Sequence, residues 1–383
     1  MASTTEARPP STTTHASLYS SDKPAITAHL LLIALSLAPL VINVPTNFNI
    51  VATAALAVYS GCWRSVKPAP PTESMTKKDA MRFPLVGSCV LFGLFLLFKF
   101  LPKWLVNAVV SLYLGGIAVF VLTSAVEPYV KDYFPESIRH MEIGLPRVKV
   151  PYVFDNTDGS MRPTVPELCL AAVSLGFCVW YYVRKHWFAN NVLGLAFCLE
   201  GIEHLSLGSV HVGIILLVGL FFYDIFWVFF TPVMVSVAKN FDGPIKLLFP
   251  RAGSAEELAG GKRPFAMLGL GDIVIPGIFV ALILRYDVQR NFRSKYFRSA
   301  FGGYVAGLIA TIVVMNVFKA AQPALLYIVP CVLGATLGHA WLAREFKSVF
   351  DFSEAAEEGK EEGKEEGEGK GTEQEKPEEK KTQ

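Results

Sequence analysis

The feature that most constrains this chain is a series of apolar runs, each close to 20 residues long and separated by polar segments. A helix of about 20 apolar residues spans the hydrocarbon core of a bilayer. Eight runs have a suitable length: about 83–101, 105–126, 167–184, 191–206, 211–236, 265–285, 300–318 and 324–343. Hydrophobic residues make up 52% of the chain. The pattern predicts an all-α polytopic membrane protein and argues against a soluble multidomain protein.

Residues 25–63 form a further apolar region that is harder to divide. Its two pieces, Ala25–Val41 and Ile50–Trp63, are short, and prolines and asparagines lie between them. Two full crossings would need about 20 residues each. We expect one crossing here, ending at Trp63, with the earlier piece lying at the interface or completing the crossing. This gives nine transmembrane helices in total.

Two short basic segments indicate the orientation of the chain. Arg64, Lys67, Lys77 and Lys78 follow the first apolar region, and five basic residues lie between positions 285 and 298. Basic loops favour the cytoplasmic side of the membrane. With nine crossings, both segments are cytosolic when the N-terminus is lumenal and the C-terminus is cytosolic.

Both ends of the chain lack apolar periodicity. Residues 1–24 are rich in Ser, Thr and Pro without the basic start of a secretory signal, and we interpret them as a disordered lumenal tail. Residues 346–383 are interpreted as a disordered cytosolic tail, in which acidic residues outnumber lysines 13 to 6 from Asp351 onward. Lys380 and Lys381 match a dilysine signal for retrieval to the endoplasmic reticulum, although a tail so rich in lysine often matches by chance.

Two aspartates interrupt the apolar runs. They occur in two short motifs, Tyr223-Asp224 and Gly269-Leu270-Gly271-Asp272. An ionised carboxylate in the hydrocarbon core is costly, so a membrane protein rarely keeps one without a function. The aspartates are 48 positions apart, on consecutive antiparallel spans and near the middle third of each. Similar membrane depth is therefore expected.

Two carboxyl groups that share one proton are suited to peptide hydrolysis. Like charge disfavours ionisation of both, so one acts as a base on a bound water while the other polarises the scissile carbonyl. Gly269 and Gly271 would allow close approach of a backbone, and Tyr223 would place an aromatic wall and a hydroxyl beside Asp224. The alternative is structural: small residues pack two helices, and each aspartate hydrogen-bonds a neighbour.

A third motif, Gln322-Pro323-Ala324-Leu325, opens the last apolar run. Proline fits the first turn of a helix, so a helix start alone explains its position. A break in the helix would also expose backbone groups with which an extended substrate segment can pair. The residues alone leave both interpretations open.

Other polar residues keep different classes of function open. Glu200, Glu203 and His204 end the fifth span, where packing or interfacial contacts are the favoured interpretation. They also permit an ion-coupled transporter with a carboxylate relay, although no internal repeat is visible. A non-catalytic quality-control scaffold is the third alternative. The six cysteines form no CxxC pair and no metal-like cluster, so we expect no metal and no cofactor.

In this order, the Tyr-Asp, Gly-Leu-Gly-Asp and Pro-Ala-Leu motifs resemble the presenilin and signal peptide peptidase clan of intramembrane aspartyl proteases. The resemblance covers about residues 50–345 and is closest to the signal peptide peptidase branch. It is carried by residues 185–191 (KHWFANN), 222–228 (FYDIFWV), 267–277 (MLGLGDIVIPG) and 322–327 (QPALLY).

The resemblance implies a nine-span, presenilin-like fold in the endoplasmic reticulum membrane, with Asp224 and Asp272 catalytic and Pro323, Ala324 and Leu325 shaping the site. Residues 25–206 would form an N-terminal bundle of spans one to five, and residues 207–345 a catalytic membrane domain. The implied partners are signal peptides and other transmembrane segments with cytosolic N-termini, the lipid bilayer, further copies of the chain and membrane-protein degradation machinery. No nucleic-acid partner is expected.

Overall fold

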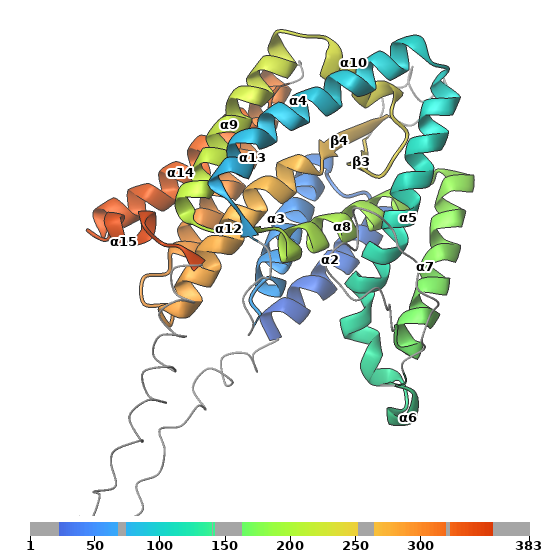
Figure 1. Ribbon diagram of the computed structural model, residues 1–383, viewed down its shortest axis with the longest axis horizontal. Coiled ribbons are helices and arrows are strands. Elements are labelled where there is room, and N and C mark those ends of the chain that lie inside the picture. Colours follow the sequence, from blue (N-terminus) through green and yellow to red (C-terminus); the bar gives the residue numbers. More distant parts are fainter. Residues whose placement is uncertain are drawn as a thin grey trace, which may run out of the picture.

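The computed structural model describes residues 23–67, 74–139, 141, 163–251, 264–318 and 322–354, which form a bundle of long helices (Figure 1). The long helices are α2 (Lys23–Val41), α3 (Thr46–Arg64), α4 (Lys77–Phe100), α5 (Lys103–Val130), α7 (Val165–Arg184), α8 (Trp187–His204), α9 (Val210–Phe229), α12 (Gly271–Gln289), α13 (Tyr296–Phe318) and α14 (Leu325–Leu342). The short ones are η1 (Lys131–Tyr133), α6 (Glu136–Arg139), α10 (Val233–Asn240) and α15 (Phe346–Phe350).

Helix α12 lies at the centre of the bundle, packed against α3, α8, α9 and α13 (Figure 1). Its residues 276–284 are all buried, so this helix has neighbours on every side. Glycines permit the close contacts. A Cβ at Gly277 would lie 2.6 Å from Ile202 Cδ1 of α8, and one at Gly213 of α9 would lie 2.7 Å from Phe279 Cδ2. The middle of α12 is therefore held in a fixed position by closely packed neighbours, and the first turn of the helix continues from it.

Helices α13 and α14 form the most extensive helix pair, and two glycines one turn apart bring their backbones together. A Cβ at Gly303 would lie 2.5 Å from the Cys331 carbonyl oxygen, and one at Gly307 would lie 2.6 Å from Ile328 Cα. Small residues at this spacing allow membrane helices to approach closely. The start of α14 is thereby fixed against α13.

Six helices in the described part of the chain are long and apolar enough to cross a membrane: α4, α5 with η1, α7, α9, α13 and α14. The chain is thus an all-α polytopic membrane protein, as expected. Helices α3, α8 and α12 have 18 or 19 residues, and each buries polar side chains inside the bundle, among them Asn49, Asn191 and Asp287. The total of nine crossings stays a prediction. In the first apolar region, α2 and α3 pack against each other, and the single crossing there also stays a prediction.

Several expected boundaries were wrong. The run 211–236 is not one helix: α9 ends at Phe229 and α10 begins after Pro232, because proline cannot continue the hydrogen-bonding of the preceding helix. The run 265–285 begins as a strand, and its helix starts only at Gly271. Asp272 is therefore in the first turn of its helix rather than near the middle third of a span.

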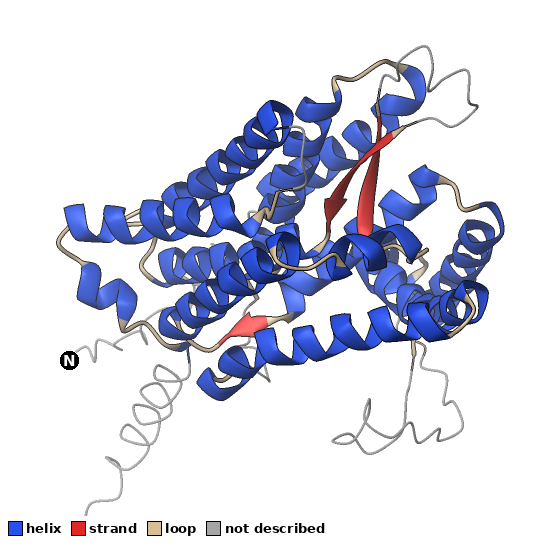
Figure 2. Cartoon of the chain, turned by 90° about the horizontal axis from the view of Figure 1, so that it is seen from above, coloured by secondary structure: helices blue, strands red, loops and turns tan. Residues whose placement is uncertain are grey.

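The fold also contains two small sheets that the apolar pattern did not predict (Figure 2). Strand β3 (Lys246–Pro250) pairs antiparallel with β4 (Phe265–Gly269), with Leu247 opposite Leu268. Strand β1 (Ser74–Met75) pairs parallel with β2 (Ser206–Leu207). The first sheet ends directly before α12.

Residues 346–354 are ordered, so the expected start of the C-terminal tail at 346 was wrong. After α15, Ser353 forms an antiparallel bridge with Ser209, and Glu354 forms an ion pair with Arg285 at 2.6 Å. Near the start of the same segment, Glu345 accepts hydrogen bonds from the hydroxyls of Ser294 and Tyr296. These contacts bind the segment to the starts of α9 and α13 and the end of α12. Residues 1–22 and 355–383, with Lys380 and Lys381, lie outside the described residues.

Candidate active site

Asp224 lies near the end of α9 and is 4% exposed. Its Oδ2 accepts a hydrogen bond of 3.0 Å from the backbone N–H of Leu325. Leu325 is the first residue of α14, and the first N–H groups of a helix have no partner within the helix. The third sequence motif therefore binds the aspartate of the first motif directly, with the positive end of the α14 dipole facing a carboxylate.

Asp272 is the second residue of α12 and is partly buried. It also occupies the N-terminal turn of a helix, where negative charge is favoured. Its carboxyl group is close enough to Asp224 for the two to interact electrostatically. The structure thus brings together two aspartates from separate apolar helices: Asp224 faces the N-terminus of α14, and Asp272 lies in the first turn of α12.

The Gly-Leu-Gly motif connects β4 to α12, and its residues have different environments. A Cβ at Gly269 would lie 3.3 Å from Asp272 Oδ2, so a side chain there would crowd the carboxylate. A Cβ at Gly271 would meet only Ile275 Cδ1, at 3.7 Å. Leu270 packs against the core, and its N–H donates to the Ile245 carbonyl at 3.1 Å. Gly269 is therefore the glycine whose small size the site requires.

The other predicted site residues lie around Asp224. The Tyr223 ring faces α4, 3.7 Å from the Cβ position of Gly87, so it packs between α4 and α9. In the third motif, Pro323 and Ala324 are buried, and the Ala324 carbonyl accepts from the Thr311 hydroxyl at 3.4 Å. Gln322 Oε1 accepts a hydrogen bond of 3.3 Å from the hydroxyl of Tyr327, the third residue of α14.

The β3–β4 sheet has one edge that leads to Asp272. The Leu248 N–H and carbonyl face away from β4 and bond to a side chain of α8. In an antiparallel pair, successive residues bond alternately to the partner strand and away from it. Leu247 and Phe249 are therefore the residues that bond to β4. The same alternation directs the backbone groups of Phe265, Met267 and Gly269 away from β3. Within the described ranges these groups have no hydrogen-bond partner, and the Met267 side chain is 53% exposed. β4 is therefore an open strand edge.

The opposite edge is closed by two asparagines of α8 whose role the sequence analysis did not assign. Asn191 Nδ2 donates to the Leu248 carbonyl and its Oδ1 accepts from the Leu248 N–H, both at 2.7 Å. Asn190 Nδ2 donates to the Lys246 carbonyl at 2.7 Å. The Asn191 amide thus replaces a neighbouring strand. The available signal was two adjacent buried amides in an apolar helix, which require hydrogen-bond partners.

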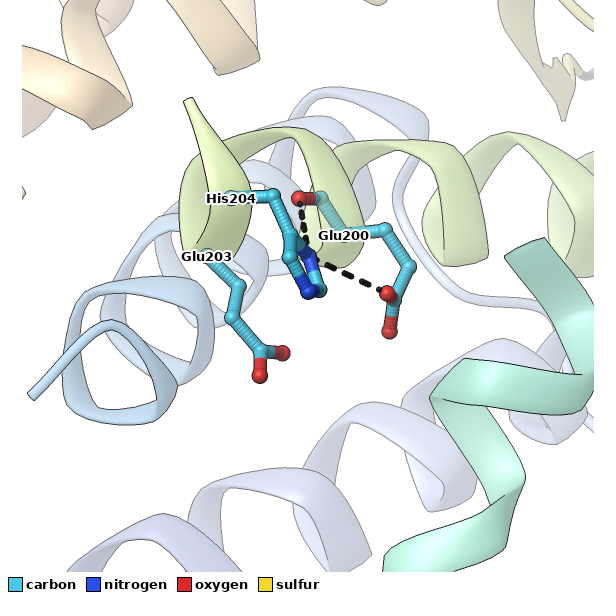
Figure 3. A group of neighbouring side chains, drawn as sticks. All are labelled: Glu200, Glu203 and His204. Carbon is cyan, nitrogen blue, oxygen red and sulfur yellow. Dashed lines mark hydrogen bonds and ion pairs between the residues drawn. The ribbon is translucent and has the colours of Figure 1, made fainter. Parts of the chain in front are cut away.

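Glu200, Glu203 and His204 at the end of α8 point into one small space (Figure 3). Arg64 of α3 donates to both glutamates, to Glu200 at 2.6 Å, and Lys67 pairs with Glu203 at 2.9 Å. His204 Nδ1 lies 3.3 Å from Glu200 Oε2. A buried carboxylate requires such pairing. The three residues have the proximity of metal ligands, but both carboxylates are already engaged by cations, and this supports the packing interpretation.

A polytopic helical bundle that brings two aspartates of different apolar helices together is the arrangement of an intramembrane aspartic peptidase. A sequence model of the family described as signal peptide peptidase matches residues 67–356. The chain is 40% identical to human signal peptide peptidase, over 80% of this chain and 83% of that protein. It is 41% identical to the mouse protein of the same name, with coverage of 80% and 82%. A rice protein, signal peptide peptidase-like 1, is 29% identical over 81% of this chain and 93% of its own length.

The chain belongs to the signal peptide peptidase family. It is therefore a membrane-embedded peptidase, a hydrolase that acts on transmembrane segments in the lipid bilayer.

Proposed function

We propose that Asp224 and Asp272 are the catalytic pair and that they cleave signal peptides and other transmembrane segments whose N-termini face the cytosol. The observation that carries the proposal is the meeting of three separate motifs: the aspartates interact with each other, and the Leu325 N–H binds Asp224. Neither a transporter nor a scaffold requires a strand edge beside such a pair.

In the proposed mechanism the pair shares one proton, because like charges at this proximity disfavour double ionisation. The Leu325 hydrogen bond fixes Asp224 through Oδ2 and leaves Oδ1 free to contact a water. The ionised carboxylate takes a proton from that water as it attacks the scissile carbonyl, and the protonated carboxyl donates to the carbonyl oxygen. As the C–N bond breaks, the carboxyl that took the proton from water gives it to the leaving amine, and a hydroxyl of the gem-diol returns its proton to the other carboxylate. The new C-terminus leaves as a carboxyl group, and the pair again holds one proton.

The open edge of β4 is the proposed substrate-binding edge. A helical substrate keeps its carbonyls in internal hydrogen bonds, so the segment to be cut must become extended. An extended segment gains backbone hydrogen bonds by pairing with Phe265, Met267 and Gly269, which directs its next residues toward Asp272. Gln322, Pro323, Ala324 and Leu325 would bound the other side of this position.

The proposed membrane orientation fits this edge. With a lumenal N-terminus and a cytosolic C-terminus, α12 runs from the lumenal side to the cytosolic side, and β4 enters the membrane in the same direction. A substrate with a cytosolic N-terminus runs the opposite way and pairs antiparallel with β4, the more stable arrangement per residue. Signal peptides are inserted at the endoplasmic reticulum, so we place the protein in that membrane, with Lys380 and Lys381 as its retrieval signal.

Substitution of either aspartate tests the proposal. Asp224→Asn and Asp272→Asn keep the side-chain shape and are expected to abolish cleavage of a fluorescently labelled signal peptide in detergent. Thermal unfolding of both variants serves as the folding control. Cleavage that persists in a folded variant would disprove the catalytic pair. Proton flux into proteoliposomes that both substitutions abolish, without proteolysis in the wild type, would identify a transporter instead. Unchanged partner binding without any activity would identify a scaffold.

The family resemblance further supports two partners, additional copies of the chain and membrane-protein degradation machinery. Both are tested by crosslinking in intact membranes followed by purification of the complex. Recovery of the chain only as a monomer, with none of the degradation machinery attached, would contradict them.

A further inference from the structure

A second site lies at the end of α12 opposite Asp272. A cavity of about 440 Å³ lies between the end of α3, the end of α12 and the start of α13. Both the basic segment after α12 and the charged end of α3 border it. In the proposed orientation this cavity therefore lies at the cytosolic interface, where lipid headgroups are found.

Aromatic rings form the walls of this cavity. The rings belong to Tyr59, Trp63, Phe292, Phe297 and Phe301. They form one connected cluster: the Tyr59 ring centroid is 5.7 Å from that of Phe301 and 5.9 Å from that of Phe297, and the Trp63 and Phe292 rings stack at 6.1 Å. A cavity lined by aromatic faces attracts a cation through their quadrupoles.

Two buried polar atoms of this cavity have no partner in the described part of the chain. Asp287 is completely buried on one side of it, and its Oδ2 accepts from the Phe297 N–H at 2.7 Å while Oδ1 has no hydrogen bond. The Trp63 Nε1–H, a donor, is also buried without a partner. Asp287 thus caps the start of α13, and its carboxylate lies beside the aromatic rings that line the cavity.

The mouth of the cavity carries the opposite charge. Lys295 and Arg298 border it, and both side chains are exposed. The site thus combines cations at its rim, aromatic faces inside and a carboxylate behind them. This order of charges fits a zwitterion that enters with its positive end first and keeps an anionic group at the mouth.

We propose that this cavity binds the phosphocholine headgroup of a bilayer lipid, with the trimethylammonium group among Tyr59, Trp63 and Phe297 and the phosphate at Lys295 and Arg298. The buried carboxylate of Asp287 adds negative potential behind the rings. A primary ammonium needs up to three hydrogen-bond acceptors, and the one carboxylate among the lining residues is completely buried, whereas a quaternary ammonium needs none.

The test is lipid binding to the full-length protein in a maltoside detergent, measured by native mass spectrometry. The probes are dihexanoyl-phosphatidylcholine and its phosphatidylethanolamine and phosphatidylglycerol counterparts. The phosphatidylcholine is expected to bind at least about fivefold more tightly than either, the size of a single exposed cation–π contact. Equal binding of all three probes, or preference for the phosphatidylglycerol, would overturn the proposal.

Variants separate the two halves of the headgroup. Tyr59→Leu is expected to weaken phosphatidylcholine binding about fivefold and leave phosphatidylglycerol binding unchanged, whereas Tyr59→Phe keeps the ring and the selectivity. Arg298→Gln should weaken both probes. Arg293→Gln is the matched control, because Arg293 is an exposed cation of the same segment that does not line the cavity.

Two further outcomes complete the test. If Tyr59→Leu does not fold, as judged by its thermal transition, Arg298→Gln still tests the proposal, because Arg298 is exposed. Unchanged phosphatidylcholine binding in Arg298→Gln would refute the phosphate contact. The last outcome concerns a peptide that contains trimethyl-lysine. If this peptide displaces bound phosphatidylcholine from the wild type at a lower concentration than free phosphatidylcholine does, the occupant is a modified protein and the proposal is overturned.

Discussion

Replacement of Asn191 tests whether its hydrogen bonds to β3 hold the open edge of β4, the proposed substrate-binding edge, in position. Asn191→Leu keeps a side chain of similar size and removes both hydrogen bonds to Leu248, each 2.7 Å long in the wild type. On that edge strand β3 then keeps the Asn190 contact and the hydrogen bond from the Thr46 hydroxyl to the Pro250 carbonyl. Because β4 is aligned through β3, the open edge beside Asp272 loses its fixed register.

The size of the effect follows from the two backbone groups that lose their partner. An unsatisfied buried group costs about 1–3 kcal/mol, and two cost about 2–6 kcal/mol. Leu248 is only partly buried, so water can reach it and the lower value, about 2 kcal/mol, applies. At 1.4 kcal/mol per factor of ten, the correctly placed sheet becomes about 30-fold less populated relative to displaced states.

The expected result is a fall of up to about 30-fold in kcat/KM for a labelled signal peptide, with faster hydrogen exchange in β3 and β4 but not in α13 and α14. Asn107→Leu is the matched control: this asparagine of α5 makes the same two kinds of backbone contact, with Asn240 and Asp242. Asn107→Leu should lower thermal stability with a much smaller loss of activity. Wild-type activity and unchanged exchange in Asn191→Leu would refute the positioning role.

Three further predictions concern single side chains. Gly269→Ala should reduce cleavage at least about tenfold, since its Cβ would lie 3.3 Å from Oδ2 of Asp272, one of the two proposed catalytic aspartates. Gly271→Ala, whose Cβ would have its nearest atom at 3.7 Å, should retain more activity, and equal losses would contradict this. Gly307→Ala should destabilise the α13–α14 pair by about 1–3 kcal/mol in thermal unfolding, whereas Gly302→Ala, which meets open space, should not. Two hydroxyl hydrogen bonds hold the pKa of Glu345 below its usual value, so its contribution to stability is present at neutral pH and is lost as pH falls through that lowered pKa. Glu345→Gln should therefore lower the melting temperature at pH 7, and this difference should shrink as pH falls below the usual glutamate pKa of about 4.3.

The amino-acid sequence determined the class of fold and the residues of the candidate site. Apolar runs of membrane length are a local property, and they predicted a helical membrane protein. Asp224 and Asp272 were recognisable because a carboxylate in such a run is costly. The third motif was ambiguous from its residues, since Pro323 fits a helix start. It is indeed a helix start, and the same feature leaves the Leu325 N–H free to bind Asp224.

Only the tertiary structure decided where α12 begins and what lies before it. The run 265–285 is apolar throughout, and hydrophobicity does not distinguish a short strand from the first turns of a helix. β4 is a strand because β3 pairs with it, and β3 is held in place by Asn191, 57 positions earlier in the chain. The ion pairs of Arg64 and the aromatic cavity beside Asp287 likewise join segments far apart in sequence. A sequence pattern shows local periodicity, and it shows which polar groups would be costly in free energy to bury. The partner that offsets this cost is determined by packing between distant segments, and only the folded chain shows it.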